Sequence, residues 1–189
     1  IFMTNVMMIP ATTAGVIYMV VMVFDAINDP IIGNLADRTK KTKMGKYRKW
    51  IIGASVPYAV AMWLSFLNPG FSLKGQIAYA LIIHLAYSIT ATMWQVPYGS
   101  IPNRLTSDPG QRVQLGVFRD WFANLAKFAL GYIPVALIAI FVTKGANSQG
   151  YFATAGICAA ICIVFTMIAG FTSKEVVEVG DEHLEGRRK

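Results

Sequence analysis

Residues 24–50 read FDAINDPIIGNLADRTKKTKMGKYRKW and combine two opposite features. The first half is largely apolar but contains two carboxylates, Asp25 and Asp29. The second half, residues 37–49, carries seven lysines and arginines. Carboxylates are rare inside long apolar helices because an unpaired charge is unfavourable away from water. The stretch therefore predicts a membrane helix that contains an acidic pair and ends at a strongly basic loop.

The composition of the whole chain supports a membrane environment. Of 189 residues, 55% are hydrophobic and only 14% are charged, and the mean hydropathy is +0.49. Soluble domains carry about a quarter charged residues. The net charge of +7 comes from basic residues that lie between apolar runs, where they orient a membrane protein and do not indicate nucleic-acid binding. We expect an all-α, polytopic membrane protein.

Apolar runs long enough to cross a bilayer need roughly 20 residues each. Pro10 supplies a helix start, and we expect local breaks at Pro30, Pro97 and Pro134. Residues 172–189 are a polar, charged tail with no apolar period. The candidate spans are residues 11–36, 50–67, 75–101, 113–141 and 151–171.

Lysine and arginine set the expected orientation of these spans. Seven lie in the loop 37–49 and four in the tail 172–189, whereas the turns 68–74 and 143–150 hold one each. Basic loops stay in the cytoplasm, so the chain is expected to begin on the outer side. No signal peptide is visible at Ile1, and we expect the chain to be a fragment.

Four motifs resemble one family of transporters. They are D-x-x-x-D-P-x-x-G-x-x-x-D-R-T at residues 25–39 followed by G-K-x-R at 45–48, QVPYGS at 95–100, R-x-x-L-x-x-x-R at 112–119 and TSKE at 172–175. Together they resemble the glycoside-pentoside-hexuronide:cation symporters of the major facilitator superfamily. The resemblance implies helices II–VI of a six-helix N-terminal half. The first helix and the C-terminal half of the transporter would then be missing partners.

The family resemblance also implies a function. Such a protein uses a sodium or proton gradient to move a sugar or glycoside across the inner, cytoplasmic membrane by alternating access. It needs no cofactor beyond the coupling ion and is not an enzyme. The chain itself contains no nucleophile elbow, His-rich metal motif or Gly-rich phosphate loop.

Asp25 and Asp29 are four residues apart, so on a helix they share one face with about 6 Å between their Cβ atoms. Two carboxylates in this arrangement can bind sodium or hold one proton. In the family this pair is the cation site, and Thr92 matches a threonine near it. Alternatively, the aspartates only neutralise Arg119 or Lys127 in a non-transporting membrane protein with a structural ion pair. Thr92 could equally bond its own backbone.

Several residues are candidates for binding the substrate. Gln95 stands where the melibiose permeases of the family have an aspartate, and it can bond a sugar hydroxyl. Trp94 and Tyr98 flank it and could stack on a sugar ring or simply pack. Arg119 matches a family arginine in the sugar cavity, but it could also reach the inner interface.

Lys127 is unexpected because it lies near mid-membrane. It could pair with Asp25, or it could attract an anionic sugar such as a glucuronide or a sulfonated hexose in proton-coupled uptake.

Gly33, Asp37 and Arg38 resemble the superfamily motif between the second and third helices. Ion pairs there could close the cytoplasmic side, with Gly33 allowing close helix contact. The simpler explanation is the orienting effect of positive charge alone. The remaining titratable candidates are interpreted as packing residues: His84 within a span, and Cys158 and Cys162 on one helix face.

Overall fold

The computed structural model describes residues 2–39, 45–106, 108–142 and 147–173. Within these ranges the chain forms helices and no β-strand, which confirms the all-α expectation for the described part. Residues 174–189 of the charged tail lie outside the described residues. The helices are α1 (Phe2–Asn5), α2 (Ala11–Arg38), α3 (Arg48–Leu64), α4 (Leu73–Ser100), α5 (Pro102–Leu105), α6 (Pro109–Val142) and α7 (Asn147–Thr172).

Three helices in the described part of the chain are long and apolar enough to cross a membrane. They are α2, α4 and the segment Ser148–Thr172 of α7. The other two ranges predicted to span fall on α3 and α6, and their crossing stays a prediction.

Prolines inside the long helices do not interrupt them. α2 continues through Pro30, α4 through Pro97 and α6 through Pro134, so the breaks expected at these positions are wrong. Proline removes one backbone hydrogen bond, but in an apolar environment the neighbouring bonds have no water to replace them and are kept. α3 likewise continues through Pro57, which the sequence pattern did not single out.

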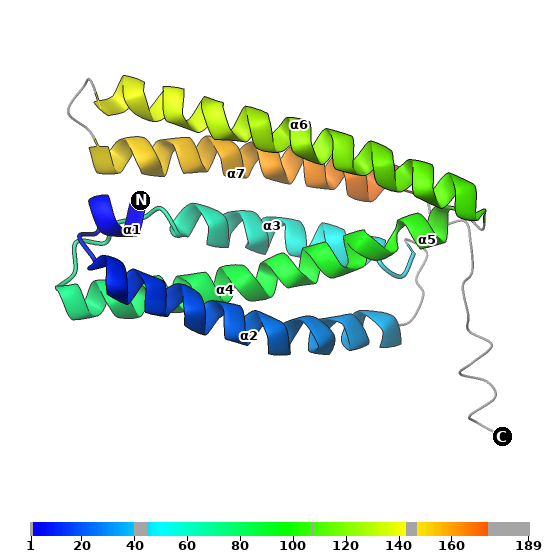
Figure 1. The fold of residues 1–189 in the computed structure, drawn as a ribbon, viewed down its shortest axis with the longest axis horizontal. Coiled ribbons are helices and arrows are strands. Elements are labelled where there is room, and N and C mark those ends of the chain that lie inside the picture. Colours follow the sequence, from blue (N-terminus) through cyan, green and yellow to red (C-terminus); the bar gives the residue numbers. More distant parts are fainter. Residues whose placement is uncertain (1, 40–44, 107, 143–146, 174–189) are drawn as a thin grey trace.

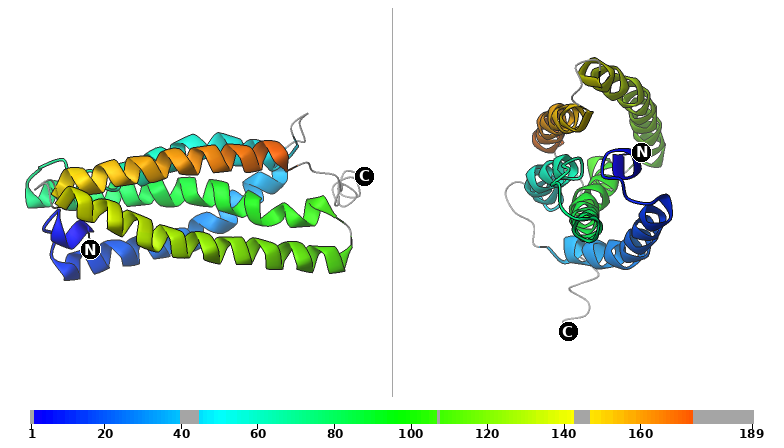
Figure 2. Two further views of the ribbon diagram at one scale, coloured as in Figure 1. Left: turned by 90° about the horizontal axis from the view of Figure 1, so that it is seen from above. Right: turned by 90° about the vertical axis from the view of Figure 1, so that its left-hand side faces the viewer.

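The five long helices lie side by side in an open arc, in the spatial order α2, α4, α3, α7, α6 (Figures 1 and 2). α3 is central and packs on α4 and α7, whereas α2 packs on α4 and α6 packs on α7. α2 and α6 therefore end the arc. Both present rows of exposed apolar side chains, including Met19, Met22 and Ile27 on α2 and Phe118, Trp121 and Phe122 on α6.

α3 and α7 pack tightly at the end of the bundle that carries Arg38 and Arg48, which we call the basic end. A Cβ atom built on Gly170 would lie 2.6 Å from Ile52 Cγ1, so only glycine fits without a shift. Beside it, the Arg48 guanidinium donates to the carbonyl oxygens of Gly170, at 2.8 Å, and Phe171, at 2.7 Å. The last carbonyls of a helix lack hydrogen-bond donors within the helix. In α7, Arg48 supplies the donors for two of these carbonyls.

At the opposite end, α1 closes a small apolar core. Phe2, Met3 and Met7 are buried there against Ala14 of α2 and Ala80 of α4. This core positions the start of α2 on α4, and the same pairing continues along both helices to the acidic residues.

Candidate functional site

Each aspartate of the acidic pair on α2 accepts a hydrogen bond from a hydroxyl on α4. Ser88 Oγ donates to Asp25 Oδ1, and Thr92 Oγ1 donates to Asp29 Oδ1 at 2.8 Å. Donors and acceptors are both four residues apart on their helices, so the two bonds lie one turn apart. The structure thus brings together the acidic pair and Thr92, and it adds Ser88.

The same row of contacts continues in both directions along α2 and α4. Above Asp25, the Tyr18 and His84 rings meet edge to face with centroids 5.7 Å apart, and His84 Nδ1 lies 2.8 Å from the Ala80 carbonyl oxygen. Below Asp29, a Cβ on Gly33 would lie 3.7 Å from Val96 Cγ1, which is ordinary van der Waals contact. We call this row the α2–α4 seam. It consists of Tyr18, Asp25, Asp29 and Gly33 facing His84, Ser88, Thr92 and Val96.

Burial differs between the two sides of the seam. Ser88 is 3% and Thr92 5% exposed, whereas Asp25 is half-buried and Asp29 is exposed. The hydroxyls are therefore fixed between the helices, and the carboxylates keep oxygen atoms open to an incoming ligand. A hydroxyl that donates its proton retains oxygen lone pairs, and a carboxylate is purely an acceptor. This set of oxygens suits a cation or a proton.

Ser88 and Asn28 were missed from the sequence. Ser88 could have been found, because it precedes Thr92 by one helical turn and shares its face. Asn28 lies between the two aspartates, is 8% exposed, and its buried Nδ2 has no hydrogen-bond partner among the described residues.

Trp94 and Tyr98 belong to a stack of aromatic rings between α3 and α4. Their rings are nearly parallel, with centroids 5.0 Å apart, and Tyr58 of α3 stacks on Trp94 at 5.9 Å. Tyr58 also stacks on Tyr87, about two turns before Trp94 on α4, at 5.5 Å. Gln95, between Trp94 and Tyr98 in sequence, is exposed. The two aromatics therefore have protein rings as stacking partners in this structure.

Arg119 and Lys127 lie on α6, at the far end of the arc from α2. Both are exposed, and Arg119 Nε lies 3.3 Å from Asp120 Oδ1 of the same helix. No ion pair joins Lys127 to Asp25 within the described part of the chain. The structure thus does not bring the α6 cations to the acidic pair.

The predicted gating residues make contacts at the basic end. Asp37 Oδ1 accepts a hydrogen bond of 2.5 Å from the Tyr47 hydroxyl, and Arg38 Nε donates to Asn34 Oδ1 at 2.9 Å. The Asp37–Tyr47 bond therefore connects the last turn of α2 to the residue that precedes α3, whereas Arg38 bonds within its own helix.

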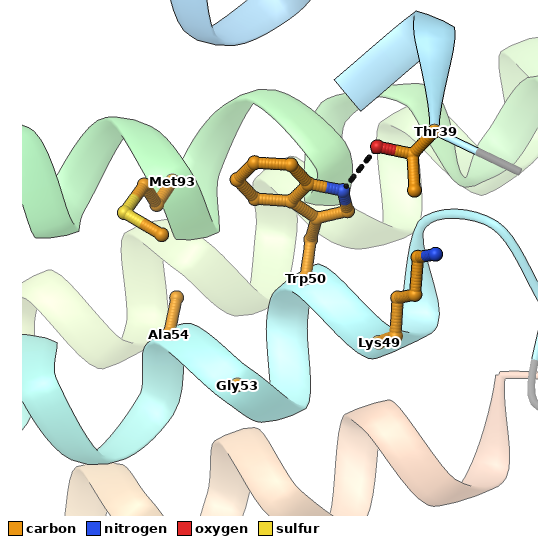
Figure 3. A pocket seen from close by; sticks show the side chains of 6 residues that line it. All are labelled: Thr39, Lys49, Trp50, Gly53, Ala54 and Met93. Atoms are coloured by element: carbon orange, nitrogen blue, oxygen red, sulfur yellow. Dashed lines mark hydrogen bonds between the residues drawn. The ribbon is translucent and has the colours of Figure 1, made fainter. Parts of the chain in front are cut away.

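A shallow cavity of about 450 Å³ opens beside these residues at the basic end, lined by Thr39, Lys49, Trp50, Gly53, Ala54 and Met93. Figure 3 shows the Trp50 indole nitrogen directed at the Thr39 hydroxyl oxygen, to which it donates at 3.0 Å. This bond ties the end of α2 to the first turn of α3.

No three His, Cys, Asp or Glu side chains gather into a metal-binding group in the ranges that the structure describes. Cys158 and Cys162 are free thiols, and Cys162 Sγ lies 3.8 Å from the Thr166 hydroxyl. The α2–α4 seam instead brings together the oxygen atoms of two carboxylates and two hydroxyls.

A family model described as MFS/sugar transport protein matches residues 1–189. The chain belongs to the glycoside–cation symporters of the major facilitator superfamily. It is 32% identical over 174 residues to YagG of Escherichia coli strain K12, whose name is that of a glycoside/cation symporter. It is 30% identical over 179 residues to the inner membrane symporter YicJ of the same strain, and 30% over 178 residues to the isoprimeverose transporter of Lactiplantibacillus pentosus.

These alignments cover 92%, 94% and 94% of the chain but only 37%, 38% and 37% of the respective relatives. The chain therefore spans less than two fifths of the length of these symporters. Membership of the family, together with the three candidate spans, makes it a multi-pass protein of the inner membrane.

Proposed function

We propose that the intact transporter moves a sugar or glycoside across the inner membrane together with sodium or a proton, by alternating access. The observation that carries this proposal is the pair of carboxylates on α2, each held by a buried hydroxyl of α4. Oxygen ligands fixed before the ion arrives lose little conformational freedom on binding it. Asp25, Asp29 and Thr92 would supply the cation site.

The competing explanation is a structural ion pair, in which the aspartates only neutralise Arg119 or Lys127. Both cations lie on α6, which packs on α7 and not on α2. The aspartates are instead satisfied by neutral hydroxyls. This arrangement leaves their negative charge available to an ion and supports the cation site.

We propose that Gln95 is the first residue of the chain to hydrogen-bond the sugar, because of its position beside the seam. Gln95 is exposed on α4 and lies about one turn from Thr92, so a sugar bound to its amide would lie beside the cation. We propose Arg119 as a second donor, approaching from α6 in the intact transporter. Trp94 and Tyr98 would contribute mainly by fixing the shape of this surface, because they form a stack with Tyr58. Stacking on the sugar itself would be their lesser role.

The uptake of radiolabelled neutral glycosides by cells that make the intact transporter tests this function. External sodium, external lithium and pH are varied one at a time. We expect uptake to rise with a cation gradient, and Asp29→Asn to abolish that response. Uptake that responds to none of the three would contradict cation coupling.

Lys127 favours a second candidate, the transport of an anionic sugar with protons. It is an exposed cation among the aromatic side chains of α6, with no ion pair in the described part of the chain. Isolated charges in membrane helices usually serve a function, and a carboxylated or sulfonated sugar would provide the missing partner. Gating by Asp37 and Arg38 stays part of both candidates.

A further inference from the structure

The cavity at the basic end shares no lining residue with the α2–α4 seam. Its volume of about 450 Å³ lies in the range of about 300–1,000 Å³ that is usual for ligand pockets. The end of α2, the first turns of α3 and one residue of α4 line it, namely Thr39, Lys49, Trp50, Gly53, Ala54 and Met93. A hollow formed by three helices at one end of a membrane bundle therefore needs an occupant.

The inner part of this cavity is apolar. Ala54 is buried on α3, and Met93 faces it from α4 (Figure 3). Gly53 is exposed, and a Cβ atom built on it would meet nothing within 4 Å. The backbone of α3 at Gly53 thus leaves open space beside apolar side chains, in which a hydrocarbon chain can lie.

The mouth of the cavity lies where the helices reach the membrane surface. α2 is a candidate span and ends at Arg38, directly before Thr39. Figure 3 shows Lys49 and Trp50 on the same side of α3, with the Trp50 indole bonded to the Thr39 hydroxyl. Lysine and tryptophan are typical of the level of the lipid headgroups. The mouth is therefore at headgroup level and the apolar part lies deeper.

Positive charge is in excess around the mouth. The described residues between 37 and 50 contain one carboxylate, Asp37, against four cations: Arg38, Lys46, Arg48 and Lys49. Whichever cation this carboxylate pairs with, positive charge remains. α3 also begins with two cations and has no acidic residue in its first turn, although negative groups are the ones that stabilise the start of a helix. An anion from outside the chain would offset this charge.

We propose that this cavity binds an acidic phospholipid, with its phosphate at Lys49 and one acyl chain along Gly53, Ala54 and Met93. From Lys49 to Ala54, α3 runs from the basic end into the bundle, which is the direction from the headgroup of a lipid to its chains. Basic pockets between membrane helices are known to bind acidic headgroups. The bound lipid would connect the end of α2 to α3 and α4, and the site is independent of the proposed cation site.

The experiment measures the thermal unfolding temperature of the purified intact transporter in detergent, because a ligand that binds the folded state raises it. Phosphatidylglycerol is the acidic probe. Phosphatidylcholine with the same chains controls for the apolar part, and inorganic phosphate controls for the anion without a chain. We expect a saturable rise with phosphatidylglycerol that exceeds the rise with phosphatidylcholine, and no rise with inorganic phosphate.

Lys49→Ala tests the headgroup contact. The phosphatidylglycerol concentration at half-effect should increase about fivefold, which is the effect of one lysine near an acidic lipid surface. Lys46→Ala is the matched control, because it removes the same charge three residues away. The Lys46 ammonium lies 5.7 Å from the centroid of the Tyr47 ring, and Lys46 does not line the cavity. The concentration at half-effect should stay close to that of the wild type.

Gly53→Leu tests the acyl-chain contact by filling the cavity, and it should reduce the stabilisation by phosphatidylglycerol. Gly15→Leu is its control, since Gly15 is also an exposed helical glycine with nothing within 4 Å of its Cβ position, but it lies on α2 outside the cavity. Lys49→Gln keeps a long polar side chain without the charge. It should weaken lipid binding as Lys49→Ala does, so the test stands even if Gly53→Leu does not fold.

Several results would overturn the proposal. A wild type that phosphatidylglycerol stabilises no more than phosphatidylcholine would exclude an acidic headgroup, and equal stabilisation by inorganic phosphate would exclude a lipid as the source of the anion. Lipid curves of the Lys49 and Gly53 variants that superimpose on the wild-type curve would exclude the cavity. An effect of Lys46→Ala as large as that of Lys49→Ala would show attraction by surface charge alone. Cation-coupled uptake is measured separately, so its failure is distinguishable from each of these results.

Discussion

Arg48 and Gly170 are joined by a hydrogen bond of 2.8 Å although 122 residues separate them in sequence. The guanidinium belongs to the first turn of α3 and the carbonyl to the last turn of α7. A second bond of 2.7 Å, to the carbonyl of Phe171, makes this a two-point cap of α7. The basic stretch of residues 37–49 thus does more than orient the chain, because one of its cations, at the start of α3, also binds the end of α7.

Removing this cap should destabilise the protein. Arg48→Ala leaves the carbonyls of Gly170 and Phe171 without a charged donor, and hydrogen bonds of charged groups contribute about 1.5–3 kcal/mol. We expect a lower thermal unfolding temperature for the purified intact transporter. Arg38→Ala is the comparison, since among the described residues Arg38 bonds only Asn34 on its own helix, and it should change the unfolding temperature less. Equal effects of the two variants would argue against the cap.

The close contact beneath the cap predicts a steric effect. In Gly170→Ala the new methyl group would meet Ile52 at 2.6 Å, and such overpacking costs roughly 1–3 kcal/mol. The double variant Gly170→Ala with Ile52→Ala should regain part of that loss, because the clashing atoms are gone. Thermal unfolding of the single and double variants measures the coupling.

Gly53→Ala is the control for this steric effect. Gly53 is also a helical glycine, on the same helix as Ile52, but nothing lies within 4 Å of its Cβ position. Alanine has the higher helix propensity, so Gly53→Ala should be neutral or slightly stabilising. A loss as large as that of Gly170→Ala would show that the clash is not the cause.

The acidic pair predicts a graded loss of coupling. Asp29→Asn removes a negative charge and should abolish cation-dependent uptake of glycoside. Thr92→Ala removes a neutral ligand and should weaken the apparent cation affinity by about tenfold while leaving some coupled uptake. Uptake as a function of cation concentration distinguishes the two. An Asp29→Asn variant that keeps its cation dependence would exclude this carboxylate from the site.

Lys127 predicts a difference between substrates. If it recognises an anionic sugar, Lys127→Ala should reduce uptake of a glucuronide or a sulfonated hexose by about tenfold and leave neutral glycosides unchanged, since one charge-assisted contact is lost. If it pairs with an aspartate in the intact transporter, uptake of every substrate should fall together. Parallel uptake of one anionic and one neutral glycoside separates these results, with the level of protein in the membrane as the control.

The sequence alone determined the features that depend on local composition and helix periodicity. Hydropathy predicted the helical membrane character, and the four-residue spacing placed Asp25 and Asp29 on one face. The motifs at residues 25–48 identified the family. Each of these signals is contained within a short segment, so no knowledge of distant contacts was needed.

Only the tertiary structure decided which helix faces meet. It placed Ser88 on Asp25 across 63 residues, stacked Trp94 on Tyr58 of α3, and set the α6 cations apart from the acidic pair. Helix periodicity gives the face on which a residue lies but not the helix that will cover that face. That choice depends on packing between segments far apart in sequence, which is why Ser88 could be assigned to Asp25 as its partner only once α2 and α4 were seen side by side.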